Sequence, residues 1–228
     1  MLFDFFNAVR QGDLISVIGT LAAAVIIIFV CFPVHESAHA YASYKLGDPT
    51  AKYQGRISLN PAHHLDLLGS ILILICGFGY AKAVPVNIHN FKNQKRDMAL
   101  TALAGPLSNI LMAVIFMAIL KVFDIMLGFV TVPYNVILNN VILIISLILQ
   151  YGASINISLA VFNMIPLPPL DCSRILGLFL SDSLYYKIMQ NEQMLFVITL
   201  ALVALGAFSN VISTVSGFIY SVLFNLFW

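Results

Sequence analysis

Long apolar runs dominate this chain, and its few charged residues lie between them. Residues 14–34 form an uncharged run, and residues 98–120, 133–162 and 194–228 form three more. About 20 apolar residues let a helix cross a bilayer core, whereas open strands would leave main-chain groups unpaired in lipid. The pattern therefore predicts membrane-spanning helices. The last run is long enough for two short crossings if it turns near residues 206–210.

The apolar run Leu67–Phe78 differs from the others because it is short. As a helix it would reach about 18 Å, against a bilayer core of about 30 Å. Gly79, Pro85 and the alternating residues Val84 and Val86 follow it. We interpret residues 67–87 as a re-entrant segment leading into a strand-like hairpin, which is tolerated at depth only where protein or water covers it.

Composition supports a membrane protein. Hydrophobic residues make up 61% of the 228 residues and charged residues 9%, whereas soluble domains have about 45–50% and 25%. This excludes a soluble enzyme and a disordered chain. The net charge of +1 gives no general attraction to nucleic acid. We expect one integral membrane domain over residues 1–228, with its core at about 14–176 and C-terminal helices at about 193–228.

The basic residues predict an orientation. If Leu67–Phe78 does not cross and residues 194–228 cross twice, nine basic residues share one face, and only Arg10 and Lys121 lie on the other. The nine are Lys45, Lys52, Arg56, Lys82, Lys92, Lys95, Arg96, Arg174 and Lys187. Because cytoplasmic loops carry the excess of Lys and Arg, we expect this face in the cytoplasm of a multi-pass cell-membrane protein.

A possible metal motif, HExxH, follows the first apolar run as His35-Glu36-Ser37-Ala38-His39. Helical residues four apart share a face, so both imidazoles can reach one zinc ion, and Glu36 can deprotonate a water molecule held there. The helix should continue through Tyr44 and stop at Gly47. That places His39 about 9 Å and His35 about 15 Å below an interface at Lys45. Polar groups at such depth usually mark function; two interfacial histidines and a helix-capping glutamate are the alternative.

A zinc hydrolase needs a third protein ligand and one open position for water. His63, His64 and His89 are candidates, although each is also typical of a histidine at the membrane interface. Most carboxylates, among them Asp48 and Asp97, lie at the ends of runs or in loops, where carboxylates are ordinarily solvated.

Asp171 is the exception among the carboxylates. It ends a turn in which Pro166, Pro168 and Pro169 force a rigid, extended backbone after the third long run. Such a turn would hold a metal ligand in a fixed position. Asp171 also precedes Arg174 by three residues, so an exposed Asp–Arg ion pair is the alternative.

Together these motifs resemble the site-2 protease family of intramembrane zinc metalloproteases. HExxH matches the family's first motif, and Asn163-x-x-Pro166-x-Pro168-x-x-Asp171 matches its second. Residues 104–109 match the small-residue pattern of its middle core helix, and residues 79–87 resemble the loop of its compact members. The resemblance covers about residues 21–176. It implies a compact member without a PDZ or CBS domain.

The resemblance implies an all-α polytopic membrane protein with about five to six transmembrane helices and one Zn²⁺ per chain. His35, His39 and Asp171 would be the metal ligands, and Glu36 the catalytic base. Asn163 would donate a hydrogen bond to the substrate or, alternatively, cap the preceding helix. Two positions depart from the family: Cys172 stands where Gly is usual, and Ala83 stands where Pro is usual.

The expected reaction is hydrolysis of a peptide bond in or near a transmembrane segment of a membrane protein. Such a substrate must unwind first, and each main-chain group then left unpaired costs several kcal/mol. We expect the extended segment containing Tyr80 and Val86 to bind the unwound substrate as an added strand; a plain re-entrant loop is the alternative.

Two other functions stay open. A membrane protein that binds or transports a metal would need the three ligands but not the base Glu36, and transporters usually show repeated halves, which this sequence lacks. An inactive protease-like protein that binds helices is the third reading, with Cys172 disturbing the site.

Overall fold

The computed structural model describes the whole chain except residues 1, 67–68, 70–81 and 130–134. Every regular element in this part of the chain is helical, which confirms the predicted class. The α-helices are α1 (Leu2–Gln11), α2 (Leu14–Ile26), α3 (Phe32–Leu46), α4 (Thr50–Tyr53), α6 (Gln94–Phe129), α7 (Val136–Asn163), α8 (Leu176–Phe179), α9 (Asp182–Gln190), α10 (Glu192–Ala204) and α11 (Ser209–Phe227). A π-helix covers Ile27–Cys31, and 3₁₀ helices cover Pro61–His63, Ile88–Asn90 and Asp171–Ile175.

The first apolar run becomes one long helix. α2, the π segment and α3 follow each other without a break over Leu14–Leu46. The helix ends where the sequence predicts, because Gly47 adopts a left-handed conformation with φ of 116° and its N–H donates to the carbonyl of Tyr44. The HExxH residues therefore lie inside a helix, not at its end.

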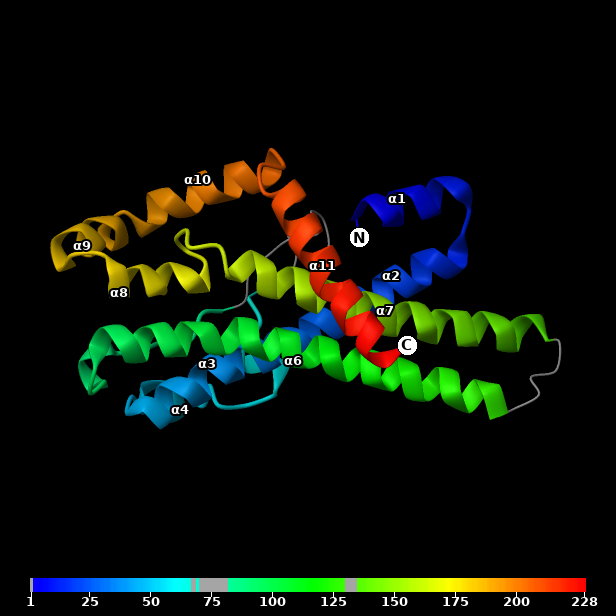
Figure 1. Cartoon of the computed structure of the whole chain (residues 1–228), viewed down its shortest axis with the longest axis horizontal. Coiled ribbons are helices and arrows are strands. Elements are labelled where there is room, and N and C mark those ends of the chain that lie inside the picture. The colour runs from blue at the N-terminus through cyan, green and yellow to red at the C-terminus, as the bar shows by residue number, and fades with distance from the viewer. Residues whose placement is uncertain (1, 67–68, 70–81, 130–134) are drawn as a thin grey trace.

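The first span and two further helices, α6 and α7, form the core. α6 and α7 lie side by side along the long axis of the molecule, and α3 packs against α6 (Figure 1). Their apolar cluster includes Cys31, Met117 and Ile157. α7 continues through Gly152, where an added Cβ would lie 2.8 Å from the ring of Phe116. Small residues thus let the core helices approach closely.

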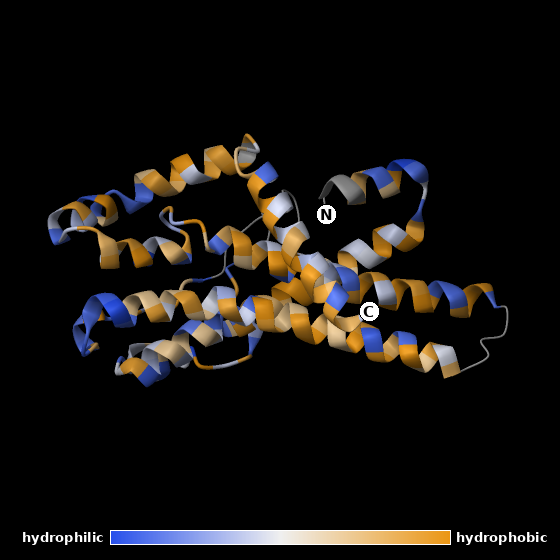
Figure 2. Ribbon diagram, in the orientation of Figure 1, coloured by the Kyte–Doolittle hydropathy of each residue, from blue (hydrophilic) through white to orange (hydrophobic). Residues whose placement is uncertain are grey.

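Many large apolar side chains are exposed, as expected for helices in lipid. Figure 2 shows hydrophobic residues along most of the long helices. In the described part of the chain, four helices are long and apolar enough to cross a membrane: Leu14–Leu46, Gln94–Phe129, Val136–Asn163 and Ser209–Phe227. The predicted turn in the last run is present, with Gly206 at φ of 74°. α10 has 13 residues, about 20 Å of helix. The count of five to six crossings therefore stays a prediction.

The predicted basic face corresponds to one end of the molecule. The Nζ of Lys95, at the start of α6, lies 2.5 Å from Oδ1 of Asp182, at the start of α9. The main-chain N–H of Lys82 donates to the carbonyl of His64 at 2.8 Å. Lys82 and His64, which flank the predicted re-entrant segment, therefore lie together, while most of that segment lies outside the described residues.

The predicted hairpin is only partly covered by the structure. Most of Leu67–Phe78 lies outside the described residues, as does Tyr80. Residues 82–87 are described and form no strand, so the strand-like interpretation is wrong for them. Pro85 has no N–H to donate, and no neighbouring strand pairs with this stretch in the described chain.

Candidate metal centre

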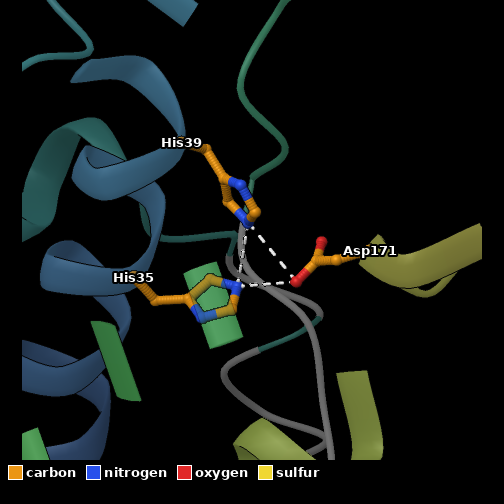
Figure 3. Close-up of side chains that lie close together, drawn as sticks. All are labelled: His35, His39 and Asp171. Carbon is orange, nitrogen blue, oxygen red and sulfur yellow. Dashed lines mark hydrogen bonds and ion pairs between the residues drawn. The ribbon is translucent and has the colours of Figure 1, made fainter. Parts of the chain in front are cut away.

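His35 and His39 occupy one face of α3, because the helical period places residues four apart above one another. Both imidazoles are buried, with 7% and 8% of their residue surface exposed. Their Nε2 atoms lie 3.2 Å apart (Figure 3). The spacing of HExxH alone is sufficient to bring these two nitrogen atoms together.

Asp171 completes the cluster from a distant part of the chain. It begins the 3₁₀ helix Asp171–Ile175, directly after the proline turn. Its Oδ2 lies 3.1 Å from Nε2 of His35 and 3.3 Å from Nε2 of His39 (Figure 3). Arg174 instead pairs with Glu192 of α10. The alternative of an Asp171–Arg174 surface pair is therefore wrong.

The three atoms fit a zinc ion. Zn–N and Zn–O bonds of about 2.0–2.1 Å in a tetrahedral site put neighbouring ligand atoms about 3.3 Å apart. The three observed separations, 3.1, 3.2 and 3.3 Å, match one face of such a tetrahedron. Three protein ligands would leave the fourth position open, as in catalytic zinc sites.

α6 fixes the orientation of His39. The Nδ1 atom of His39 lies 2.7 Å from the carbonyl oxygen of Thr101, so Nδ1 carries the proton and donates it to that oxygen. This tautomer leaves the Nε2 lone pair free for the metal, which is the usual way that neighbouring groups orient ligating histidines. No sequence pattern marks Thr101, because a carbonyl group can come from any residue.

Gly105 brings α6 against both imidazoles. A Cβ at this position would lie 2.3 Å from Nε2 of His39 and 2.6 Å from Cε1 of His35, so only glycine fits. The small-residue pattern at residues 104–109 therefore serves the close approach of α6 to the metal centre. Pro106 and Asn109 follow on the same helix, and both are buried.

Glu36 lies beside the cluster without joining it. Its side chain is half-buried and lines the same cavity as the two histidines. The described residues give its carboxylate no hydrogen bond and no ion pair. The carboxylate is therefore available to a water molecule or a substrate, as a base must be.

A cavity of about 1140 Å³ opens beside these groups. Its wall includes Asn163 and Val86, two of the predicted substrate-binding residues. The Nδ2 of Asn163 donates to the carbonyl of Leu159 one turn earlier, which is the helix-end role. Asn109 also lines the cavity, and no described residue gives its Oδ1 a hydrogen bond.

The other candidate ligands lie elsewhere. Among the described residues, the group that could hold a metal consists of His35, His39 and Asp171. His63 is bonded through Nδ1 to the carbonyl of Gly55 and His89 is exposed, as interfacial histidines can be. His64 is fully buried and bonded to the carbonyl of Ser58, so its interfacial assignment is wrong.

Three further residues that the sequence singled out are buried. Asp48 and Asp97, expected to be solvated, are both buried and hydrogen-bonded. Cys172 is buried as a free thiol and is not part of the metal-binding group.

Comparison with known proteins places this centre in a family. The model of peptidase family M50 matches residues 23–207. The chain is 39% identical over 178 residues to a Bacillus subtilis protein named "Putative zinc metalloprotease YwhC", covering 78% of each chain. It is 29% identical over 148 residues to "Putative zinc metalloprotease MJ0611" of Methanocaldococcus jannaschii, covering 64% of each. No solved structure matches the chain at a significant level.

The names of both relatives contain "zinc metalloprotease". The cluster of His35, His39 and Asp171 has the ligand set and spacing of a zinc site. Together these findings confirm Zn²⁺ as the predicted cofactor. The matched region contains HExxH, the residues around Gly105 and the proline turn with Asp171. The four apolar helices agree with a multi-pass membrane protein. The chain therefore belongs to peptidase family M50, the site-2 protease family of zinc metalloproteases.

Proposed function

We propose that this protein is an intramembrane endopeptidase, which hydrolyses a peptide bond in or near a transmembrane segment of another membrane protein. One observation carries the proposal: three ligand atoms spaced as in a zinc site share a cavity with an unpaired carboxylate, Glu36. A protein that only binds or carries metal needs the ligands, but it has no use for an unpaired base beside them.

Each residue has a role that its position allows. His35, His39 and Asp171 would hold a zinc ion, which when bound would lower the pKa of a water molecule to about 7 and polarise a carbonyl group. Glu36 would accept a proton from that water and later deliver it to the leaving amine. The Thr101 carbonyl keeps His39 in the tautomer that presents Nε2.

The substrate must be unwound before its peptide bond is accessible. We propose that the segment containing Tyr80 and Val86 pairs with the unwound main chain, as in strand addition. Val86 supports this because it lines the cavity. Asn163 lines it as well, and its Oδ1, which makes no hydrogen bond to a described residue, can accept one from the substrate. Its Nδ2 carries two N–H groups, so one can donate to the substrate, as the motif implies, while the other donates to the carbonyl of Leu159.

The proposed orientation puts the basic end of the molecule in the cytoplasm. The metal centre lies nearer this end, because His39 is seven residues from the end of α3 at Leu46, or about 10 Å along the helix. Water and substrate would reach the zinc through the cavity from this side.

The test is a screen of single-span membrane proteins for cleavage by the wild type and by Glu36→Gln. Cleavage by the wild type alone, with equal zinc content in both proteins, supports the proposal. Cleavage by neither protein, with full zinc content, would favour a metal-binding or inactive protein. Substrates with Gly or Pro near the scissile bond should be cleaved faster, because they cost less to unwind.

The strand-addition proposal has its own test. Photo-crosslinkers at Tyr80 or Val86 in the Glu36→Gln protein should capture a substrate found in the screen. Capture beside Asn163 but not at these two positions would show that the substrate binds elsewhere.

A further inference from the structure

One stretch of main chain along the cavity has free hydrogen-bonding groups. We call residues 82–87 the edge segment. Ala83, Val84 and Val86 line the cavity that contains the metal centre. The described chain gives no hydrogen bond to the main-chain groups of Val84 or Val86. Val84 and Val86 are half-buried, so these groups are open to a substrate main chain that enters the cavity.

Arg56 holds the front of the edge segment. Its guanidinium donates to the main-chain carbonyls of Lys82 and Ala83, the latter at 3.0 Å, and also to the carbonyl of His63. Arg56 is only 5% exposed, and no ion pair of the described residues includes it. The planar fork of an arginine holds several carbonyls in a fixed geometry, whereas the three donors of a lysine rotate about a single nitrogen.

Asp48 holds the rear of the segment. It is fully buried, and its Oδ2 accepts the main-chain N–H of Asn87 at 2.8 Å. Its Oδ1 accepts from the Asn90 amide at 2.7 Å and from the N–H of Thr50 at 3.1 Å. Burial raises the pKa of this carboxyl, but these hydrogen bonds outweigh burial and hold the pKa below its usual value.

The rear anchor is tied to the helix that carries the zinc ligands. Asp48 follows Gly47, the residue that ends α3, and its own N–H donates to the carbonyl of Ser43 on that helix at 2.9 Å. The positions of His35 and His39 along α3 therefore fix the distance from the metal centre to the rear of the edge segment.

We propose that Arg56 and Asp48 are positioning residues, which hold the two ends of the edge segment so that the free groups of Val84 and Val86 face the substrate. This inference rests on the proposed function and extends it. Burying two unpaired charges is costly. Charged groups make hydrogen bonds about twice as strong as neutral ones, which suits them to fix a main chain that lacks a sheet. The anchors leave the middle of the segment unbound between them.

The experiment compares two conservative variants with two matched controls. Arg56→Lys keeps the positive charge and loses the planar guanidinium. Asp48→Asn keeps the size and shape of the side chain and loses its negative charge. Lys52→Gln and Asp182→Asn remove charges from the same end of the molecule, at exposed residues outside the cavity. For each protein, we would measure zinc content, kcat/KM on a single-span substrate from the screen, and substrate capture by a crosslinker at Val86 in the Glu36→Gln background.

We expect the two anchor variants to keep their zinc and lose at least about tenfold in kcat/KM, because small misplacements of a bound substrate are costly. Capture at Val86 should fall in parallel, and both controls should match the wild type. Wild-type kcat/KM and capture in Arg56→Lys and Asp48→Asn would overturn the inference. A loss of zinc in step with activity in both would also overturn it, since it would assign them a purely structural role.

A separate measurement keeps this inference distinct from the proposed function. If the wild type cleaves no protein in the screen, the proposed function fails, but the anchors can still be tested. A spin label at Val86, in a chain whose native cysteines are replaced by alanine, should become more mobile in Arg56→Lys and in Asp48→Asn. Unchanged mobility in both would show that these residues do not hold the segment.

Discussion

Gly105→Ala should empty the metal centre without unfolding the protein. The added Cβ would lie 2.3 Å from Nε2 of His39 and 2.6 Å from Cε1 of His35. Ordinary contact begins at 3.4 Å, so the His39 ring or α6 must move by the difference, about 1.1 Å. The His39 ring has little freedom, because its other nitrogen is bonded to the carbonyl of Thr101 on α6 itself.

A displacement of this size is large for a zinc site. Ligand distances are held to about 0.2 Å, and even changes that only disturb the orientation of a ligand reduce metal affinity about 10- to 100-fold. We therefore expect Gly105→Ala to reduce zinc affinity at least about a hundredfold, with proteolysis lost in proportion. The helix itself should not suffer, because alanine favours a helix over glycine by about 1 kcal/mol.

The assay is zinc content per chain in purified protein at a series of free zinc concentrations, with thermal unfolding measured in parallel. Gly128→Ala is the matched control, because Gly128 lies on the same helix α6 and its Cβ would meet nothing within 4 Å. Gly128→Ala should bind zinc as the wild type does. Wild-type zinc affinity in Gly105→Ala would refute the close contact between α6 and the two imidazoles.

Four further outcomes test the site and the topology. Glu36→Gln should keep its zinc and lose detectable cleavage; full cleavage by this variant would end the protease proposal. Asp171→Ala should lose zinc, and unchanged zinc content would remove Asp171 from the ligands. Cysteines at Lys52 and Lys92 should both resist an impermeant label added outside intact cells, and labelling at one alone would mean that the chain crosses between them. Because its pKa is lowered in the fold, Asp48 contributes stability that is full above the ordinary pKa of 3.8 and is lost as the pH falls through the lower folded value. The melting temperature should therefore fall less between about pH 6 and pH 3 in Asp48→Asn than in the wild type, and equal falls would contradict this.

The sequence predicted the parts of the site that follow from local periodicity. His35 and His39 share a face because a helix has 3.6 residues per turn, and Gly47 ends that helix because it tolerates a left-handed conformation. Asp171 is different, since no local rule brings a distant turn to α3. Asp171 was predicted as a ligand from the resemblance to a family and from the rigidity of the proline turn.

The features that the sequence did not predict depend on tertiary contacts. In the sequence, Asp48 resembles any other loop carboxylate. In the structure, it accepts hydrogen bonds from the main-chain N–H of Asn87 and the side-chain amide of Asn90. A signal existed, because an Asp that bonds the N–H two residues later forms a recognisable turn, and Thr50 stands there. Arg56 had no such signal, since its partners are main-chain carbonyls that any sequence provides.

The π segment Ile27–Cys31 separates two helical halves that face different neighbours. α2 packs on α7, where Gly19 meets Leu147, while α3 packs on α6. A π turn contains one more residue than the α turn it replaces. Losing that extra residue would turn the segment into an ordinary α turn, so the two halves of the first span would stay nearly in register. A single lost codon here would therefore leave both the face of α2 that meets α7 and the catalytic face of α3 nearly in place. We expect natural length variation among relatives to be tolerated at this point of the first span, and not between His35 and His39.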